Sequence, residues 1–262
     1  LVKILFIIGV TVGFFAPVLT WVERKQSAIM QDRIGANRAD IMGFTALGLF
    51  HAIADAIKMF TKEDFIPQGA NRFLHTFAPI IAVIPAILTF AVVPFGGQYE
   101  LWGENVNLVI SDLDVGLLFV FAIASLATYG YVIAGWASNS NWSLLGSMRT
   151  ASQMISYEVT MGLTIIGVLM VFGSMKLTEI GAAQEEFLNW GFFLQPLGFF
   201  MFFAASIAEN KRIPFDAPEA EAELVAGYFT EYSGLKFGMF FMAEFIEMVT
   251  IGAIVTILFF GA

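Results

Sequence analysis

The chain has 262 residues, of which 58% are hydrophobic, and a formal net charge of −9 at pH 7. An apolar fraction this large exceeds that of ordinary soluble domains and indicates a membrane protein. Because the chain has no cysteine, we expect no iron–sulfur cluster, disulfide or thiolate metal site within it. Its two histidines, His51 and His75, lie far apart in sequence and are interpreted as structural, so we expect no metal site.

Six apolar runs are long enough to cross a hydrocarbon core about 30 Å thick. They lie at Leu1–Trp21, Phe77–Phe95, Val115–Trp136, Ile155–Phe172, Phe192–Ala208 and Phe237–Phe260. The first run ends in charged residues without a small-residue cleavage pattern, so we interpret it as a retained anchor and not a signal peptide. The predicted fold class is therefore all-α, a polytopic transmembrane helix bundle that forms a single domain over residues 1–262.

The basic residues are unevenly distributed among the connections between these runs. Of the 13 Lys and Arg residues, all but Lys3 and Lys176 lie in the connections after the first, third and fifth runs. By the positive-inside rule these connections face the cytoplasm, and the N-terminus faces the opposite side. We expect the inner (plasma) membrane of a bacterium, with the N-terminus on the periplasmic side.

The first of these basic connections contains a segment, Phe44–Phe60, with the apolar spacing of a helix. Its apolar positions share one face: Leu47, Phe50, Ile53, Ile57 and Phe60. Its polar positions, His51, Asp55 and Lys58, fall on the other face. The segment is too charged to span, so it is predicted to lie at the membrane interface or to dock on a partner. A surface helix packed on the bundle is equally compatible with this pattern.

The connection after the fifth run is strongly acidic and reads AENKRIPFDAPEAEAELVAGYFTEYSG from Ala208 to Gly234. Its carboxylates are Glu209, Asp216, Glu219, Glu221, Glu223 and Glu231. So many carboxylates beside a bilayer must be solvated, protonated or paired, and proton handling is the function that this cost suggests. Asp216 and Glu219 also have the spacing of a helix N-cap and its third-residue partner, so capping would account for those two.

Three further carboxylates fall within predicted spans. Glu244 and Glu247 lie three residues apart on one face of the sixth run, and Glu158 is predicted at the start of the fourth. An ionised carboxylate at mid-bilayer costs about 2.5–3.5 kcal/mol, so such residues usually face the bundle interior or a water path. Snorkelling near a helix end is the alternative, mainly for Glu158 and Glu247.

Several segments occur together in one order that is typical of a known family. They are ERKQSAIMQDRIGANR, ADAIKMFTKEDFIP, AGWASNSNWSLLGSMR, SYE, ENKRIPFDAPEAEAELVAGYFTEYSG and KFGMFFMAEF. From Trp21 to the C-terminus the chain closely resembles the H-subunit family of NADH–quinone oxidoreductase, the membrane subunit of respiratory complex I at the junction with the peripheral arm. The resemblance implies a subunit of a proton-translocating enzyme, with no redox centre or catalytic residue of its own.

The resemblance also implies roles for individual residues. Quinone would be the substrate, and its chamber would be formed in part by Arg24, Arg33, Asp55, Lys58, Arg212 and Asp216. An acidic proton path would lead from the chamber through Glu158, Glu209, Glu219, Glu221, Glu223 and Glu244, to which we add Glu231 of the same loop. The implied partners are the quinone-site and terminal iron–sulfur subunits of the peripheral arm, the small and antiporter-like membrane subunits, and lipid, with no nucleic acid. No cofactor is expected to be bound covalently.

The chain departs from the family pattern at a few positions. Gly35-Ala36-Asn37 stands where Gly-Pro-Asn is usual, and Lys211 adds a cation beside the acidic path. Members of the family usually have eight spans and continue past Phe260 with two more. Two alternatives remain open: the related subunit of a membrane-bound hydrogenase, and an independent ion transporter. The lack of an internal repeat argues against the transporter.

Overall fold

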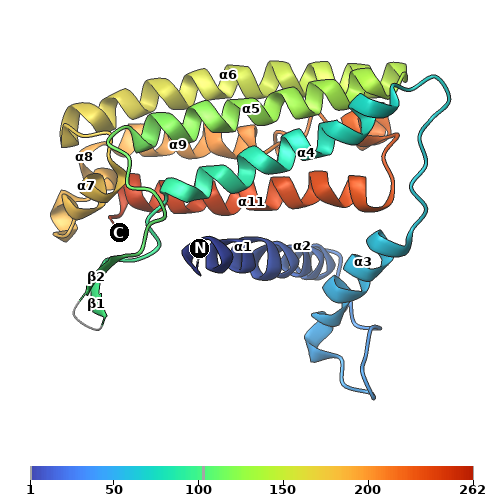
Figure 1. Cartoon of the computed structure of the whole chain (residues 1–262), viewed down its shortest axis with the longest axis horizontal. Coiled ribbons are helices and arrows are strands. Elements are labelled where there is room, and N and C mark those ends of the chain that lie inside the picture. Colours follow the sequence, from blue (N-terminus) through green and yellow to red (C-terminus); the bar gives the residue numbers. More distant parts are fainter. Residues whose placement is uncertain (1, 102–103, 262) are drawn as a thin grey trace.

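A computed structural model of the chain describes residues 2–101 and 104–261, and the elements in it are almost entirely helical (Figure 1). The longer helices are α1 (Val2–Val10), α2 (Ala16–Met30), α3 (Phe50–Thr61), α4 (Arg72–Thr89), α5 (Gly116–Ala137), α6 (Asn141–Phe172), α9 (Pro196–Glu209) and α11 (Gly234–Phe259). Shorter helices are α7 (Leu177–Ala182), α8 (Gly191–Leu194) and α10 (Glu221–Leu224). Single turns of other helix types are η1 (Thr11–Phe15), η2 (Ala46–Gly48), η3 (Phe90–Val92), η4 (Phe187–Asn189) and η5 (Gly227–Phe229). Two strands, β1 (Gln98–Leu101) and β2 (Glu104–Asn107), pair antiparallel with Gln98 opposite Asn107. The predicted fold class, a polytopic helical membrane protein, is confirmed.

Five helical stretches are long and apolar enough to span a membrane: Val2–Met30, Arg72–Val92, Gly116–Ala137, Asn141–Phe172 and Gly234–Phe259. The fifth predicted run, Phe192–Ala208, is not one continuous helix, because the chain breaks at Gln195, between α8 and α9. Pro196 begins α9, as proline does at the first position of many helices. The 14 residues of α9 rise about 21 Å, which is less than a hydrocarbon core of about 30 Å.

The fourth span also differs from its prediction. Since α6 begins at Asn141 and not near Ile155, Glu158 lies in the middle of a 32-residue helix. The first half of α6 is rich in polar residues, which lowers its hydropathy. Several of them, Ser143, Ser147 and Thr150, are fully buried against neighbouring elements. Packing within the bundle therefore stabilises a helix that hydropathy alone does not predict.

The bundle consists of α4, α5, α6, α9 and α11, which run lengthwise beside one another (Figure 1). Gly130 lets α4 and α5 approach closely, because a Cβ atom there would lie 2.8 Å from the backbone nitrogen of Ala82. Small residues at helix contacts are typical of membrane bundles. The first span lies beside α11, and only 17% of the residues in its most apolar part are buried.

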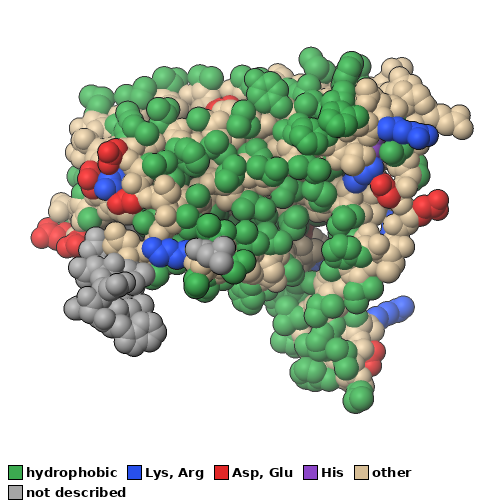
Figure 2. Space-filling model, viewed as in Figure 1, with side chains coloured by type: hydrophobic (Ala, Val, Ile, Leu, Met, Phe, Trp, Pro, Cys, Tyr) green, Lys and Arg blue, Asp and Glu red, His purple; other side chains and the backbone are tan. Residues whose placement is uncertain are grey.

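Charged side chains lie mainly at the two ends of the bundle, and hydrophobic side chains cover the flank between them (Figure 2). Large apolar residues are exposed along this flank, for example Leu163 and Met170 of α6, at 65% and 82%. An apolar belt between two polar ends is the surface that a bilayer requires.

Candidate functional site

An open cavity of about 590 Å³ lies between α2, α3, α11 and the loop that joins α2 to α3. We call it the basic cavity, because Arg24, Arg33 and Arg38 line it. Glu23, His51 and Phe241 also belong to its lining. Two residues predicted for the quinone chamber, Arg24 and Arg33, therefore line one hollow. His51 has a structural contact here, since its Nε2 atom accepts weak hydrogen bonds of 3.4 Å from the backbone of Arg38 and Ala39.

Helix α3 contributes a second layer behind Arg24. Asp55 of α3 forms an ion pair with Arg24, and Lys58 Nζ lies 3.7 Å from the other oxygen of Asp55. The two carboxylate oxygens thus each face one cation. The apolar face of this segment is exposed, with Ile53 and Ile57 accessible at 57% and 59%. The predicted amphipathic character of Phe44–Phe60 is confirmed, although the helix begins only at Phe50.

Asp216 lies on the surface of the acidic loop and does not cap a helix. It does not line the basic cavity, and its side chain is exposed. The prediction that it caps a helix is wrong, because its backbone oxygen accepts hydrogen bonds from Glu219 N and Ala220 N in a tight turn. Helix α10 begins only at Glu221, after Ala220. The turn directs Glu219 toward the bundle, and no helix forms at Asp216 for a side chain to cap.

Glu244 of α11 lies inside the bundle with 2% of its surface exposed. The hydroxyl of Tyr228 donates a hydrogen bond to its Oε1 atom. Lys211 Nζ lies 3.5 Å from the same oxygen, and Arg212 Nη2 lies 3.9 Å from Oε2. Burial, followed by the charge of Glu244, raises the pKa of Tyr228 well above its usual value, so this hydroxyl remains protonated and can donate.

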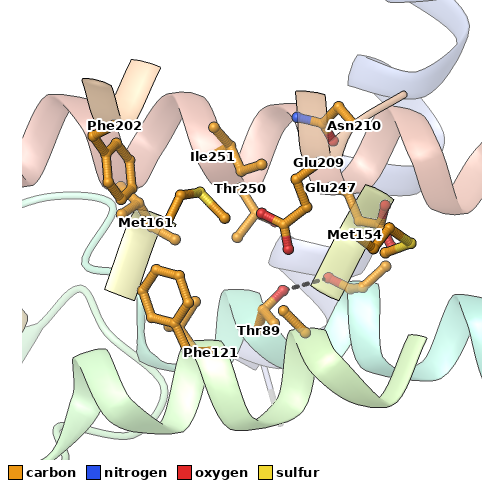
Figure 3. Close-up of a pocket in the computed structure, with 14 residues that line it drawn as sticks. Thr89, Phe121, Met154, Met161, Phe202, Glu209, Asn210, Glu247, Thr250 and Ile251 are labelled. Carbon is orange, nitrogen blue, oxygen red and sulfur yellow. Dashed lines mark hydrogen bonds between the residues drawn. The ribbon is translucent and has the colours of Figure 1, made fainter. Parts of the chain in front are cut away.

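Glu209 and Glu247 line an internal cavity of about 40 Å³ (Figure 3). Thr89 and Phe121 lie across the cavity from the two carboxylates, and Asn210 is beside them. A volume of this size has room for a few water molecules, since each needs about 10–15 Å³. Outside the cavity, the hydroxyl of Tyr131 lies 3.4 Å from Glu247 Oε1 and donates to it.

Glu158 of α6 also lies near this region. It accepts a hydrogen bond from Ser125 of α5, and its charge interacts electrostatically with Glu209. We refer to Glu158, Glu209, Glu219, Glu244 and Glu247 together as the carboxylate cluster. Four of the seven residues predicted for the proton path belong to it. Glu247, which the sequence marked as costly in a membrane, is the fifth member.

The pKa of Glu219, in the loop outside the spans, is raised from 4.5 to about 7. Burial is the main cause, followed by the negative charge of Glu244, while Lys211 and Arg212 act in the opposite direction. A group with this pKa exchanges protons near neutral pH. That property suits a carboxylate placed between the aqueous side and the bundle interior.

Glu223 of the acidic loop faces away from the cluster, toward Arg149. Glu223 has a side chain that is 64% exposed and pairs with Arg149 at 2.7 Å. Glu231 is half-buried, and its charge acts on His75. The side chain of Glu221 lies outside the described residues.

One side chain joins the basic cavity to the carboxylate cluster. Arg212 Nη1 lies 3.1 Å from Glu23 Oε1, on the cavity wall, while its Nη2 atom faces Glu244. Sequence reasoning missed Glu23, Tyr131 and Tyr228 as members of the site. Of these three, only Tyr228 had any signal in the sequence, which is its position inside the acidic connection. In the part of the chain that the structure describes, no three His, Asp or Glu side chains gather in a way that would hold a metal ion.

Comparison with known proteins identifies the family of this chain. The sequence model of a family described as NADH dehydrogenase matches residues 2–262. The chain is 48% identical to the first of the H subunits of NADH-quinone oxidoreductase in Geobacter metallireducens over 260 residues, which cover 99% of this chain and 76% of the relative. It is 46% identical to the second H subunit of Geobacter sulfurreducens over the same shares of both chains. It is 49% identical to the second H subunit of Rhizobium meliloti, over 93% of this chain and 72% of that one. The chain belongs to the NADH dehydrogenase family, among proteins named as the H subunit of NADH-quinone oxidoreductase.

Proposed function

We propose that this chain is the membrane subunit of a proton-translocating NADH–quinone oxidoreductase that forms part of the quinone chamber and couples quinone reduction to proton movement. The observation that carries the proposal is the contact of Arg212 with both Glu23 and Glu244. Through it, a charge change in the basic cavity acts directly on a carboxylate inside the bundle. The names of the relatives favour this function over a hydrogenase subunit or an independent transporter.

The basic cavity fits the polar end of a quinone. Reduction of a quinone places negative charge on its oxygens, which protonation then removes. Arg24 and Arg33 line the cavity, where they would bind the oxygens of the quinone before reduction and also stabilise that charge. Asp55 and Lys58 would orient Arg24 from behind, since Asp55 pairs with both cations. Phe241 supplies an apolar wall from α11.

The carboxylate cluster would carry the coupling step. Negative charge that develops in the cavity attracts Arg212 and weakens its hold on Glu244. A carboxylate that loses a neighbouring cation binds a proton more readily. Glu219 would supply that proton, and Glu209, Glu247 and Glu158 would pass the change toward neighbouring membrane subunits. Asp216, Glu221, Glu223 and Glu231 belong to the same acidic loop and would serve on its aqueous side.

The proposed setting follows from the same function. The subunit would contact the peripheral-arm subunits that hold the quinone site and the terminal iron–sulfur cluster, and the small and antiporter-like membrane subunits. The basic connections would face the cytoplasm of a bacterium, with the N-terminus in the periplasm. Quinone would be a diffusible substrate, with no covalently bound cofactor in this chain.

The test uses the intact enzyme in proteoliposomes with Glu244→Gln in this subunit. We expect quinone-linked NADH oxidation and proton pumping to fall together, while NADH oxidation by ferricyanide, which needs no quinone, is retained. Glu185→Gln is the matched control, because Glu185 is exposed at the other end of the bundle. Normal pumping by the Glu244→Gln enzyme would refute the coupling role. Failure of a photoreactive quinone analogue to label residues 24–38 would refute the chamber.

A further inference from the structure

Lys211 occupies a backbone position that does not favour lysine. It follows α9 directly and has a left-handed conformation, with φ of 56°. Lys211 N bonds to Ala208 O at 3.2 Å and Arg212 N bonds to Ile207 O at 3.4 Å, the pattern that closes many helices. Glycine is usual at this position and asparagine is tolerated, because other residues are strained there. Local structure therefore gives no reason for a lysine.

The side chain of Lys211 is also in an unfavourable place for a cation. It is fully buried, at 0% exposure, and Nζ has no hydrogen-bond acceptor in the described part of the chain. The ammonium lies 3.8 Å from the ring centroid of Tyr131 and 5.9 Å from that of Tyr228. An aromatic face stabilises a desolvated cation in part. Its nearest charged neighbour is Glu244, at 3.5 Å.

Several elements contribute titratable or charged groups to the surroundings of the ammonium. Glu209 comes from α9, Glu219 and Arg212 from the loop, Glu244 and Glu247 from α11, Tyr131 from α5 and Tyr228 from η5. Carboxylates outnumber cations in this set. The side chain of Arg212 is 25% exposed and also forms an ion pair with Glu23. Lys236, the other buried lysine of the described residues, pairs with Asp64 instead.

We propose that Lys211 is a positioning residue for proton transfer, whose ammonium is the resident counter-charge that keeps the interior of the carboxylate cluster ionised. Several carboxylates buried together without a cation would all be neutral, and a neutral carboxyl group cannot accept a proton. With Lys211 among them, one carboxylate keeps its negative charge and stays available as an acceptor. Lys211 thereby sets the lower pH limit at which the cluster can take up protons.

This inference rests on the proposed function, so its test compares three variants of the intact enzyme in proteoliposomes. Lys211→Asn removes the charge and is compatible with the left-handed backbone, so the protein is expected to fold and assemble. Lys211→Arg keeps the charge. Glu244→Gln tests the coupling role itself. The readouts are the pH dependence of proton pumping driven by NADH and a short-chain quinone, and the assembled amount from ferricyanide reduction.

We expect Lys211→Asn to move the acid limb of the pumping profile to higher pH by about one unit or more. The reason is that an opposite charge within about 4–6 Å lowers the pKa of a carboxyl group by that amount. Lys211→Arg is expected to keep the wild-type profile. If Lys211→Asn keeps the wild-type profile while Glu244→Gln abolishes pumping, only the role of Lys211 is overturned. If the pH profile of Lys211→Arg is displaced as far as that of Lys211→Asn, the charge is not what matters and the inference also fails. If Glu244→Gln pumps normally, the proposed function itself has failed.

Discussion

Arg212 and Glu23 form an ion pair of 3.1 Å between the acidic loop and the second helix. The two residues are 189 positions apart in sequence. Because the same guanidinium lies 3.9 Å from Glu244 Oε2, it contacts one carboxylate on the wall of an open cavity and another inside the bundle. A charge that appears in the cavity can therefore change the surroundings of a buried group without a large movement of the backbone.

We expect Arg212→Gln to slow quinone-linked NADH oxidation by about 10- to 100-fold, since a hydrogen bond to a charged group contributes about 1.5–3 kcal/mol. Oxidation of NADH by ferricyanide should be unchanged, because it bypasses the cavity. Lys62→Gln is the control, as Lys62 is exposed and lies off the cavity. Wild-type quinone turnover in the Arg212→Gln enzyme would show that the bridge is dispensable.

Substitution of Arg24 should affect quinone binding. It lines the basic cavity and is held by Asp55. Arg24→Gln should raise the apparent KM for a short-chain quinone by about tenfold, in line with the loss of one charge-assisted contact. The rate at saturating quinone should change less. Steady-state kinetics over a quinone series separates the two parameters, and a fall in kcat at constant KM would contradict a binding role.

The raised pKa of Glu219 should make the stability of the protein depend on pH. Its folded pKa of about 7 lies above its ordinary value of 4.5, so the folded state binds a proton more tightly than the unfolded state. The stability that this group contributes is complete below about pH 4.5 and is lost as the pH rises through about 7. The apparent melting temperature of the wild-type enzyme should therefore fall between about pH 5 and about pH 8 by more than that of Glu219→Gln. Parallel melting curves for the two enzymes would contradict the burial of this carboxylate.

The most uniform spans could be predicted from the sequence almost to the residue. The third run was expected at Val115–Trp136, and α5 extends from Gly116 to Ala137. An uninterrupted apolar run of this length has few other ways to bury its backbone polar groups. The first half of α6 was missed, because its stability depends on Ser143, Ser147 and their neighbours packing inside the bundle, which periodicity does not reveal.

The candidate site divides in the same way. The cost of a carboxylate within an apolar run predicted that Glu244 faces the bundle interior, and its 2% exposure confirms this. The partners of Glu244 could not be predicted, since Tyr228, Lys211 and Arg212 reach it only through the turns of the acidic loop. The same turns explain why Asp216 does not cap a helix. Local spacing describes single elements, whereas the site arises from contacts between elements.

Those turns depend on Gly227, which leads to the last prediction. Gly227 has φ of 61°, and a Cβ atom there would lie 2.1 Å from the backbone oxygen of Pro218. Gly227→Ala would add about 1–2 kcal/mol of backbone strain and a clash that only a shift of the loop can relieve. Since Tyr228 is the next residue, that shift would remove its hydrogen bond to Glu244.

We expect Gly227→Ala to reduce the amount of assembled enzyme in membranes and to lower its apparent melting temperature, measured by native gels stained for NADH oxidation and by thermal inactivation. Gly162→Ala is the matched control in α6, because no atom lies within 4 Å of its added Cβ and alanine favours a helix by about 1 kcal/mol. Equal assembly and melting of the two variants would mean that the loop tolerates a side chain at Gly227. The position of Tyr228 would then not depend on the close approach of Gly227 to Pro218.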